Sequence, residues 1–174
     1  MDLREALAAE HSKAQALRVA EFIGDSRARF EELVRILTGD DRLLAQRAAW
    51  VVTQCAETNP ETVLPSLEKL LQLLRQPDLH DAVKRNTMKV ASMLEIPDDI
   101  AGLAAGIAFD LLTSPEEAVA VKANAMGVLE KLCLREPALA DELRLAIEQQ
   151  LPLNPKAAFQ ARARHVLRTL DRLP

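Results

Sequence analysis

The chain has no tyrosine, a single tryptophan and only 5 glycines in 174 residues. β-Sheet proteins are enriched in aromatic and β-branched residues and rely on glycine in their turns, so this shortage disfavours a sheet. The 2 cysteines, Cys55 and Cys133, form neither a CxxC motif nor a cysteine–histidine cluster. Two buried, reduced thiols are the simplest account of this pattern, and we expect neither a disulfide framework nor a structural zinc site.

Long hydrophobic runs are also missing. No segment approaches the roughly 18 to 20 consecutive apolar residues that a membrane-spanning helix requires. Residues 1–5 are not followed by the apolar core of a signal peptide. We therefore expect a soluble, cytoplasmic protein without a membrane partner.

Motifs of enzyme active sites are equally scarce. The sequence has no glycine-rich phosphate loop, no HExxH motif and no metal-ligand spacing. His80 and Asp81 are neighbours, and adjacent side chains on a helix point about 100° apart, so we expect this pair to cap or begin a helix. We predict no enzymatic activity, no metal, no cofactor and no small-molecule substrate.

What the sequence does contain is an internal repeat. Hexapeptides that begin at Arg47, Arg85, Ala123 and Arg162 align with one another, at offsets of 38, 38 and 39 residues. A period in this range, in a chain rich in alanine, leucine, glutamate and arginine, is typical of stacked helix pairs. The sequence therefore predicts an all-α fold, specifically an α-solenoid.

Residues that typically end or cap helices predict where the helices of this chain begin and end. Glycine followed by aspartate at residues 24–25 and 39–40 indicates the end of one helix and the cap of the next. Ser114, with Glu117 three residues later, fits a capping box. The expected helices, about nine in all, cover residues 3–23, 26–37, 41–57, 61–75, 79–95, 98–112, 115–134, 137–150 and 155–172.

The same repeat predicts the domain organisation. One helix pair cannot bury its own apolar stripes, so the pairs are expected to stack into a single domain over residues 1–174. Within it we expect a divergent N-terminal cap pair at 1–38, three repeats at 39–153 and a C-terminal capping helix at 154–174.

Four segments of the repeat carry a family resemblance: residues 47–50 (RAAW), 80–87 (HDAVKRNT), 121–122 (VK) and 162–164 (RAR). Together they are similar to a family of short bacterial HEAT-like repeat proteins of unknown function, and they imply HEAT-like helix pairs. Members of that family have often carried an adenylosuccinate lyase label. We reject it for this chain, because such lyases have a serine-rich mobile loop with a Met-Pro pair and a much longer chain.

The repeat also aligns basic side chains. Arg47, Arg85 and Arg162 occupy equivalent positions on successive inner helices, and equivalent positions of a solenoid form a ridge on its concave surface. Because a planar guanidinium can bind a carboxylate or a phosphate with two hydrogen bonds, the ridge is a candidate binding strip. With its neighbours in each repeat, the candidate site comprises Arg47, Trp50, Asp81, Lys84, Arg85, Lys122, Arg162 and His165.

A structural interpretation of the same residues stays open and is the one we favour. In HEAT-like stacks an arginine at this position commonly bonds carboxylates or helix-end carbonyls of the neighbouring repeat, which makes the row a ladder between repeats. Trp50 is expected in the core, where a tryptophan buries a large apolar area. Asn86 and Asn124, at equivalent positions of the apolar stripe, are expected to be structural.

Charge bears on the partner. The net charge is −4, but residues 154–174 carry five basic residues against one acidic residue, which leaves −8 on the remainder. The negative charge of this remainder disfavours nonspecific binding to nucleic acid. The preferred hypothesis is therefore a non-enzymatic scaffold that binds another protein or an acidic peptide segment. The alternative is nucleic-acid binding, by analogy with the HEAT-like alkylpurine DNA glycosylases.

Overall fold

The computed structural model describes residues 1–173, and within this range it contains helices, turns and loops but no β-strand. The all-α prediction is therefore confirmed. The chain divides into two compact units, residues 1–95 and the residues from Ile96 onward. The first unit contains α1 (Leu3–Ala9), α2 (Lys13–Ile23), α3 (Arg27–Leu37), α4 (Arg42–Thr58), α5 (Pro60–Val63), the 3-10 helix η1 (Leu64–Ser66), α6 (Leu67–Leu73) and α7 (Asp81–Met93). The second contains α8 (Asp98–Thr113), α9 (Val119–Arg135), the 3-10 helix η2 (Pro137–Leu139), α10 (Ala140–Gln150) and α11 (Ala157–Leu170).

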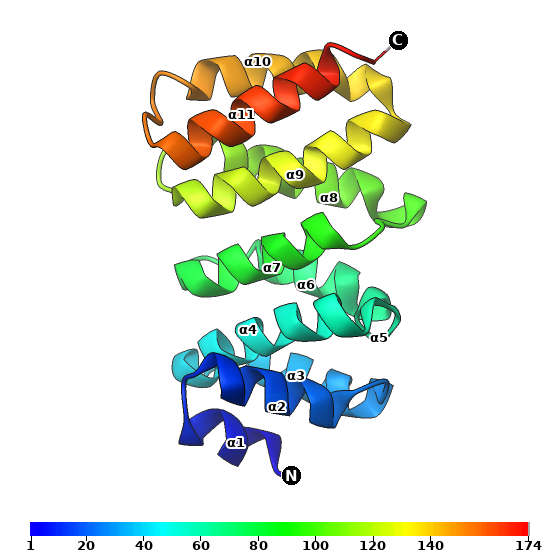
Figure 1. Cartoon of the computed structure of the whole chain (residues 1–174), viewed down its shortest axis with the longest axis vertical. Helices are drawn as coiled ribbons and strands as arrows, with labels where there is room; N and C mark the ends of the chain where they lie inside the picture. Colours follow the sequence, from blue (N-terminus) through cyan, green and yellow to red (C-terminus); the bar gives the residue numbers. More distant parts are fainter. Residues whose placement is uncertain (174) are drawn as a thin grey trace. The chain divides into compact units, whose positions relative to one another are not determined.

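Two layers of helices build the first unit (Figure 1). α4 packs against α2 and α7 in one layer, whereas α3, α5 and α6 lie in the other. Helix starts are set by side chains that accept hydrogen bonds from backbone N–H groups, which would otherwise lack partners. These caps are Asp2, Ser12, Ser26, Asp41 and His80.

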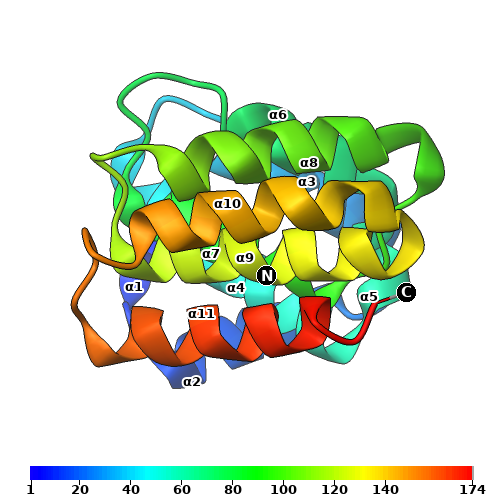
Figure 2. The ribbon, with the colours of Figure 1, turned by 90° about the horizontal axis from the view of Figure 1, so that it is seen from above.

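The second unit has the same layered arrangement. α8 packs on α9 and α10, and α11 also packs on α9 and α10. Figure 2 shows α8 and α11 on opposite sides of this unit. Large side chains without solvent exposure fill its interior, among them Leu112, Met126 and Phe159.

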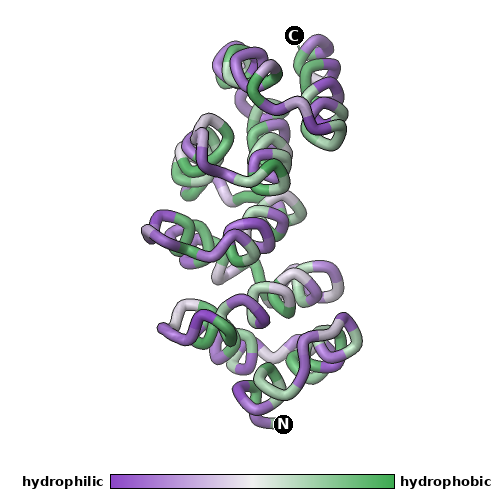
Figure 3. Tube along the Cα trace, turned by 90° about the vertical axis from the view of Figure 1, so that its left-hand side faces the viewer, coloured by the Kyte–Doolittle hydropathy of each residue, from purple (hydrophilic) through white to green (hydrophobic). Residues whose placement is uncertain are grey.

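The helices are amphipathic. Figure 3 shows hydrophilic and hydrophobic positions alternating within single helical turns. On α4, for example, Ala45, Ala48, Ala49 and Val52 are all buried, as their i, i+3, i+4, i+7 spacing predicts. Among the described residues, none of the helices combines the length and apolar character needed to cross a membrane.

Two of the predicted helices are interrupted. Residues 3–23 form α1 and α2 instead of one helix, because Ser12 Oγ accepts a hydrogen bond from the Gln15 N–H and caps a new helix. The predicted helix at 61–75 is broken by η1, which contains Pro65. Proline has no N–H to donate and disfavours a continuous α-helix at that point.

The start of a third predicted helix is wrong. Residues 115–134 were expected to be helical, but α9 begins at Val119. The Ser114 hydroxyl accepts a hydrogen bond from the Glu116 N–H, two residues on, so it forms a local turn. The predicted helix start at Ser114 is therefore wrong, because Ala118 occupies the N-cap position of α9.

Both cysteines are free and buried, as the sequence predicts. Burial raises the pKa of the Cys55 thiol to about 12. Burial, together with the nearby Glu130 carboxylate, raises the pKa of Cys133 to about 11. Because the thiolate is the nucleophilic form, these raised pKa values disfavour reaction of either thiol at neutral pH.

Candidate functional site

Arg47, on α4, is bonded to the backbone of α1. Its Nη1 atom donates to Leu7 O at 2.6 Å and to Ala8 O at 2.8 Å. These carbonyls belong to the last turn of α1, where no helical N–H remains to pair with them, and a cation there interacts favourably with the helix dipole. Arg47 therefore serves as a rung of a structural ladder. Its Nε is buried and has no hydrogen-bond partner among the described residues.

Trp50 lies one turn after Arg47 and is only half-buried. The core position predicted for it is wrong, whereas its repeat equivalents Met88 and Met126 are fully buried. The Trp50 ring instead packs against His11, with the ring centroids 5.3 Å apart and the planes inclined at 53°. His11 reaches the tryptophan because the chain leaves helical geometry between α1 and α2.

A cavity of about 220 Å³ lies beside the Trp50 ring. We call it the Trp50 pocket, and its lining residues are His11, Gln46, Trp50, Ala82, Arg85 and Asn86. Arg85 and His11 are exposed at its rim. Ala82 belongs to the first turn of α7, so the positive end of that helix dipole lies at the pocket.

The start of α7 is fixed by His80. The Ala82 N–H donates to His80 Nδ1 at 3.1 Å, which confirms the predicted capping role. Asp81 is exposed at the first position of α7, and Lys84 is half-buried one turn further on. Neither Asp81 nor Lys84 lines the Trp50 pocket.

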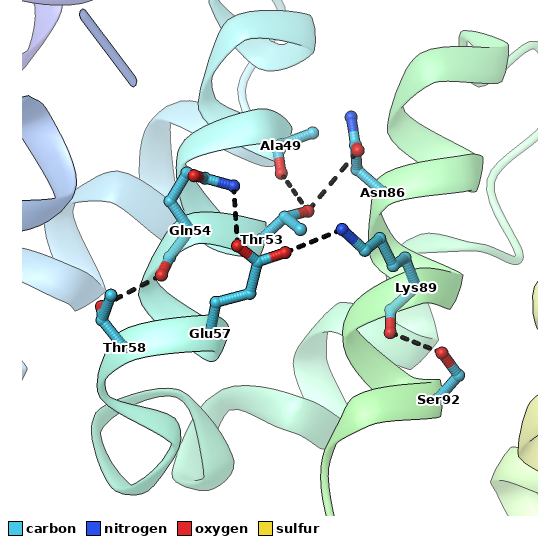
Figure 4. Close-up of polar contacts among 8 residues, drawn as sticks. All are labelled: Ala49, Thr53, Gln54, Glu57, Thr58, Asn86, Lys89 and Ser92. Atoms are coloured by element: carbon cyan, nitrogen blue, oxygen red, sulfur yellow. Dashed lines mark hydrogen bonds and ion pairs between the residues drawn. The ribbon is translucent and has the colours of Figure 1, made fainter. Parts of the chain in front are cut away.

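Polar side chains join α4 to α7 beyond the pocket (Figure 4). Lys89 Nζ donates to Glu57 Oε1 at 2.8 Å. The Thr53 hydroxyl donates to Ala49 O at 3.2 Å and lies 3.5 Å from Asn86 Oδ1. These contacts agree with the structural role expected of Asn86, and they join α4 to α7, which supply Gln46, Trp50, Ala82, Arg85 and Asn86 to the pocket.

In the second unit, Lys122 does not lie on a surface. Only 3% of the residue is exposed, and its Nζ donates to Gln150 Oε1 at 2.7 Å. Asn154 Nδ2 donates to the same oxygen at 3.2 Å. Burial lowers the pKa of Lys122, while the charge of Glu117 acts in the opposite direction. The expectation of an exposed ridge position for Lys122 is therefore wrong, because α10 and the turn after it supply polar partners in the interior.

Arg162 and His165, the other predicted site residues of the second unit, converge on one carboxylate. Arg162 Nη2 is 3.0 Å from Glu130 Oε2, and His165 Nε2 is 3.2 Å from Glu130 Oε1. The Thr169 hydroxyl also donates to Glu130 Oε1, at 2.7 Å. Glu130, on α9, is only 9% exposed. Arg162 is therefore a second rung of the ladder, with a carboxylate in place of helix-end carbonyls.

The structure thus brings Trp50 and Arg85 to one pocket and commits several other ridge residues to internal bonds. Sequence reasoning missed His11 and Gln46 as pocket residues, and no local signal marks either. It also missed Glu130, although a carboxylate among Val128, Leu129 and Leu132, with Lys131 as the one other charge in the segment 127–133, is a usable signal for a buried ion pair. In the part of the chain that the structure describes, no group of three or more His, Cys, Asp or Glu side chains is placed to hold a metal ion.

Comparison with known proteins gives one match. A family model described as HEAT repeat domain matches residues 3–170. No curated protein and no solved structure matches the chain. The match extends over nearly the whole sequence and agrees with the layered helices of each unit. The chain therefore belongs to the HEAT repeat family.

Proposed function

We propose that this HEAT repeat protein is a non-enzymatic interaction scaffold whose Trp50 pocket binds an acidic segment of another protein. The observation that carries the proposal is the half-buried Trp50 ring beside a cavity of about 220 Å³, with Arg85 and His11 exposed at the rim. Tryptophan and arginine are among the residues that contribute most to binding energy at protein interfaces. Helical repeat proteins commonly bind extended segments.

The pocket suits a segment that carries an apolar side chain next to a carboxylate. The Trp50 ring offers an apolar surface with little conformational entropy to lose. The Arg85 guanidinium can bind a carboxylate with two parallel hydrogen bonds, and the start of α7, at Ala82, favours negative charge. We expect one anchoring side chain to fill the cavity and the neighbouring carboxylate to pair with Arg85.

Nucleic-acid binding receives less support from the same ridge. Lys122 is buried, and Arg47 and Arg162 already bond groups within the protein. A phosphate-binding strip would need these cations at the surface, since affinity for nucleic acid rests on neutralising phosphates. We therefore treat it as an outcome that the binding experiment must distinguish.

Trp50 is the only tryptophan of the chain, so its fluorescence reports on the pocket alone. We would titrate the protein with synthetic peptides in which leucine or phenylalanine is next to aspartate or glutamate. Binding should shift the emission to shorter wavelength, because the half-buried ring loses contact with water. A short duplex DNA serves as the competing probe.

The charge reversal Arg85→Glu should weaken peptide binding by about tenfold or more, the equivalent of about 1.4 kcal/mol. Lys69→Glu is the matched control, because Lys69 is exposed on α6, away from the pocket. The proposal fails if no peptide changes the emission at about 1 mM, where a binding free energy of about −4 kcal/mol is still detected. It also fails if both reversals weaken binding equally, or if only the DNA binds.

A further inference from the structure

One side of the second unit carries a basic row on α11. Arg164 and Arg168 are exposed and lie one helical turn apart. Arg162, which bonds Glu130 on α9, is two residues before Arg164 and therefore about 200° away around the helix. The basic row thus lies on the side of α11 that is turned away from α9.

An acidic row runs beside it on α10. Arg144 Nη2 pairs with Asp171 Oδ1, just after α11, at 2.9 Å, which places Arg144 on the side of α10 next to α11. Asp141 is three residues before Arg144 and Glu148 four after it, so both share that side of the helix. Both carboxylates are exposed. Leu145, between them, is 56% exposed.

These charges have no ion-pair partners within the described chain. Arg164 donates only to the carbonyl of Gln160, and neither Arg164 nor Arg168 has an ion pair with a described carboxylate. The same holds for Asp141 and Glu148 with respect to described cations. Two rows of opposite charge therefore lie on neighbouring helices without ion pairs of their own, and an exposed leucine sits between the acidic residues.

We propose that a second copy of this chain docks on this side, which we call the α10–α11 face and which comprises Asp141, Leu145, Glu148, Arg164 and Arg168. The Arg144–Asp171 pair joins the first half of α10 to the end of α11, and α10 and α11 run antiparallel, so Glu148 is level with residues 164–168. A two-fold axis parallel to the helices places α10 of one copy opposite α11 of the other. Because rotation does not shift residues along the axis, Glu148 stays level with residues 164–168. Glu148 of each copy then meets Arg164 and Arg168 of the other.

A self-complementary face of this kind is what a two-fold dimer requires. The identity of the occupant follows from the charges. Each copy supplies carboxylates that can pair with the guanidinium groups of the other copy, and guanidinium groups that can pair with its carboxylates. An acidic peptide would neutralise only the basic row and would leave the carboxylates of α10 next to its own. A nucleic acid would meet the same repulsion along its whole length.

The size of the face sets the strength of the dimer. α10 has 11 residues and α11 has 14, so they are about 16 and 21 Å long. Two neighbouring helices of this length offer roughly 400 Å² per copy, at the low end for protein interfaces. We therefore expect a dissociation constant of about 10 to 100 μM, and a strong dependence on salt, which screens exposed ion pairs.

Sedimentation velocity of the full chain at about 10 to 500 μM, a range that spans the expected dissociation constant, tests the proposal. Glu148→Arg and Arg168→Glu should each weaken dimerisation by about tenfold. Combined in one chain, they restore the opposite-charge pairing and should recover most of the loss. Asp110→Arg on α8 and Arg18→Glu on α2 are matched controls at exposed positions and should leave the dimer unchanged.

Several outcomes would overturn the second copy as the occupant. One is a chain that stays monomeric at about 500 μM in low salt, near 20 mM, where the screening length is over 20 Å. Another is a dimer that none of the α10–α11 variants weakens, or one that the double variant fails to recover although its circular dichroism is native. A third is a monomer whose Arg164 and Arg168 bind a glutamate-rich peptide or single-stranded DNA, because that result would assign the basic row to another partner.

Discussion

Replacing Arg47 by methionine tests directly whether the arginine row is structural. The side chain reaches from α4 to the last turn of α1, with two contacts of 2.6 and 2.8 Å to carbonyl oxygens. Methionine keeps most of the aliphatic packing and removes only the charged donor. The variant therefore isolates the hydrogen bonds from the packing of the side chain.

The expected loss is about 2 kcal/mol. A hydrogen bond from a charged group contributes about 1.5 to 3 kcal/mol net. Here one Nη1 atom serves both carbonyls, and Ala8 is exposed, so water can partly replace the arginine. The two contacts should therefore amount to about one strong bond. For a chain of this length, a loss of that size lowers the melting temperature by roughly 4 to 8 °C.

The loss should also be local. α1 has 7 residues, which is too short to be stable alone. It is held by the buried Leu3 and Leu7, by Arg47, and by Gln15 Nε2, which donates to Ala6 O. Urea unfolding gives the global free energy, and hydrogen exchange should show α1 opening before the other helices of its unit. Arg47→Lys is the control, since one ammonium can keep part of the bonding.

The ladder interpretation would be refuted by a loss below about 0.5 kcal/mol, the range of ordinary surface substitutions, together with unchanged exchange in α1. If the same variant lost peptide binding at the Trp50 pocket without losing stability, Arg47 would belong to the binding strip instead.

Two further predictions concern buried polar groups. Burial lowers the pKa of Lys122, so between that lowered value and the ordinary value of 10.5 the unfolded chain binds more protons than the folded one. The free energy of unfolding, relative to Lys122→Met, should therefore rise as pH increases toward 10.5, and a flat or falling difference in denaturant titrations would contradict the burial effect. Cys55 and Cys133, with pKa values of about 12 and 11, should resist a thiol reagent at pH 8 in the native protein and react fully in guanidinium. Rapid labelling of either thiol under native conditions would show that its helix opens readily.

The repeat period predicted the fold well because each helix pair buries apolar side chains at equivalent positions against its neighbours. Side-chain register alone could not predict exposure. Lys122 shares the register of the half-buried Lys84, yet Gln150 and Asn154, far away in sequence, give it polar partners in the interior. Trp50 was misplaced for the opposite reason, since the unpredicted break before α2 supplies His11 as its neighbour in place of core side chains.

The Glu130 contacts have a consequence for how the sequence can change. Arg162, His165 and Thr169 meet this one carboxylate from positions spread over two turns of α11. A single inserted residue between Arg162 and Thr169 would rotate the hydroxyl by about 100° and carry it away from the carboxylate. An insertion in the loop at 151–156 leaves all three in phase with one another, but it would disturb the bonds that Gln160 Nε2 donates to Leu151 O and Asn154 O. A change of length within α11 is therefore costly, even at positions where the inserted side chain would meet only water.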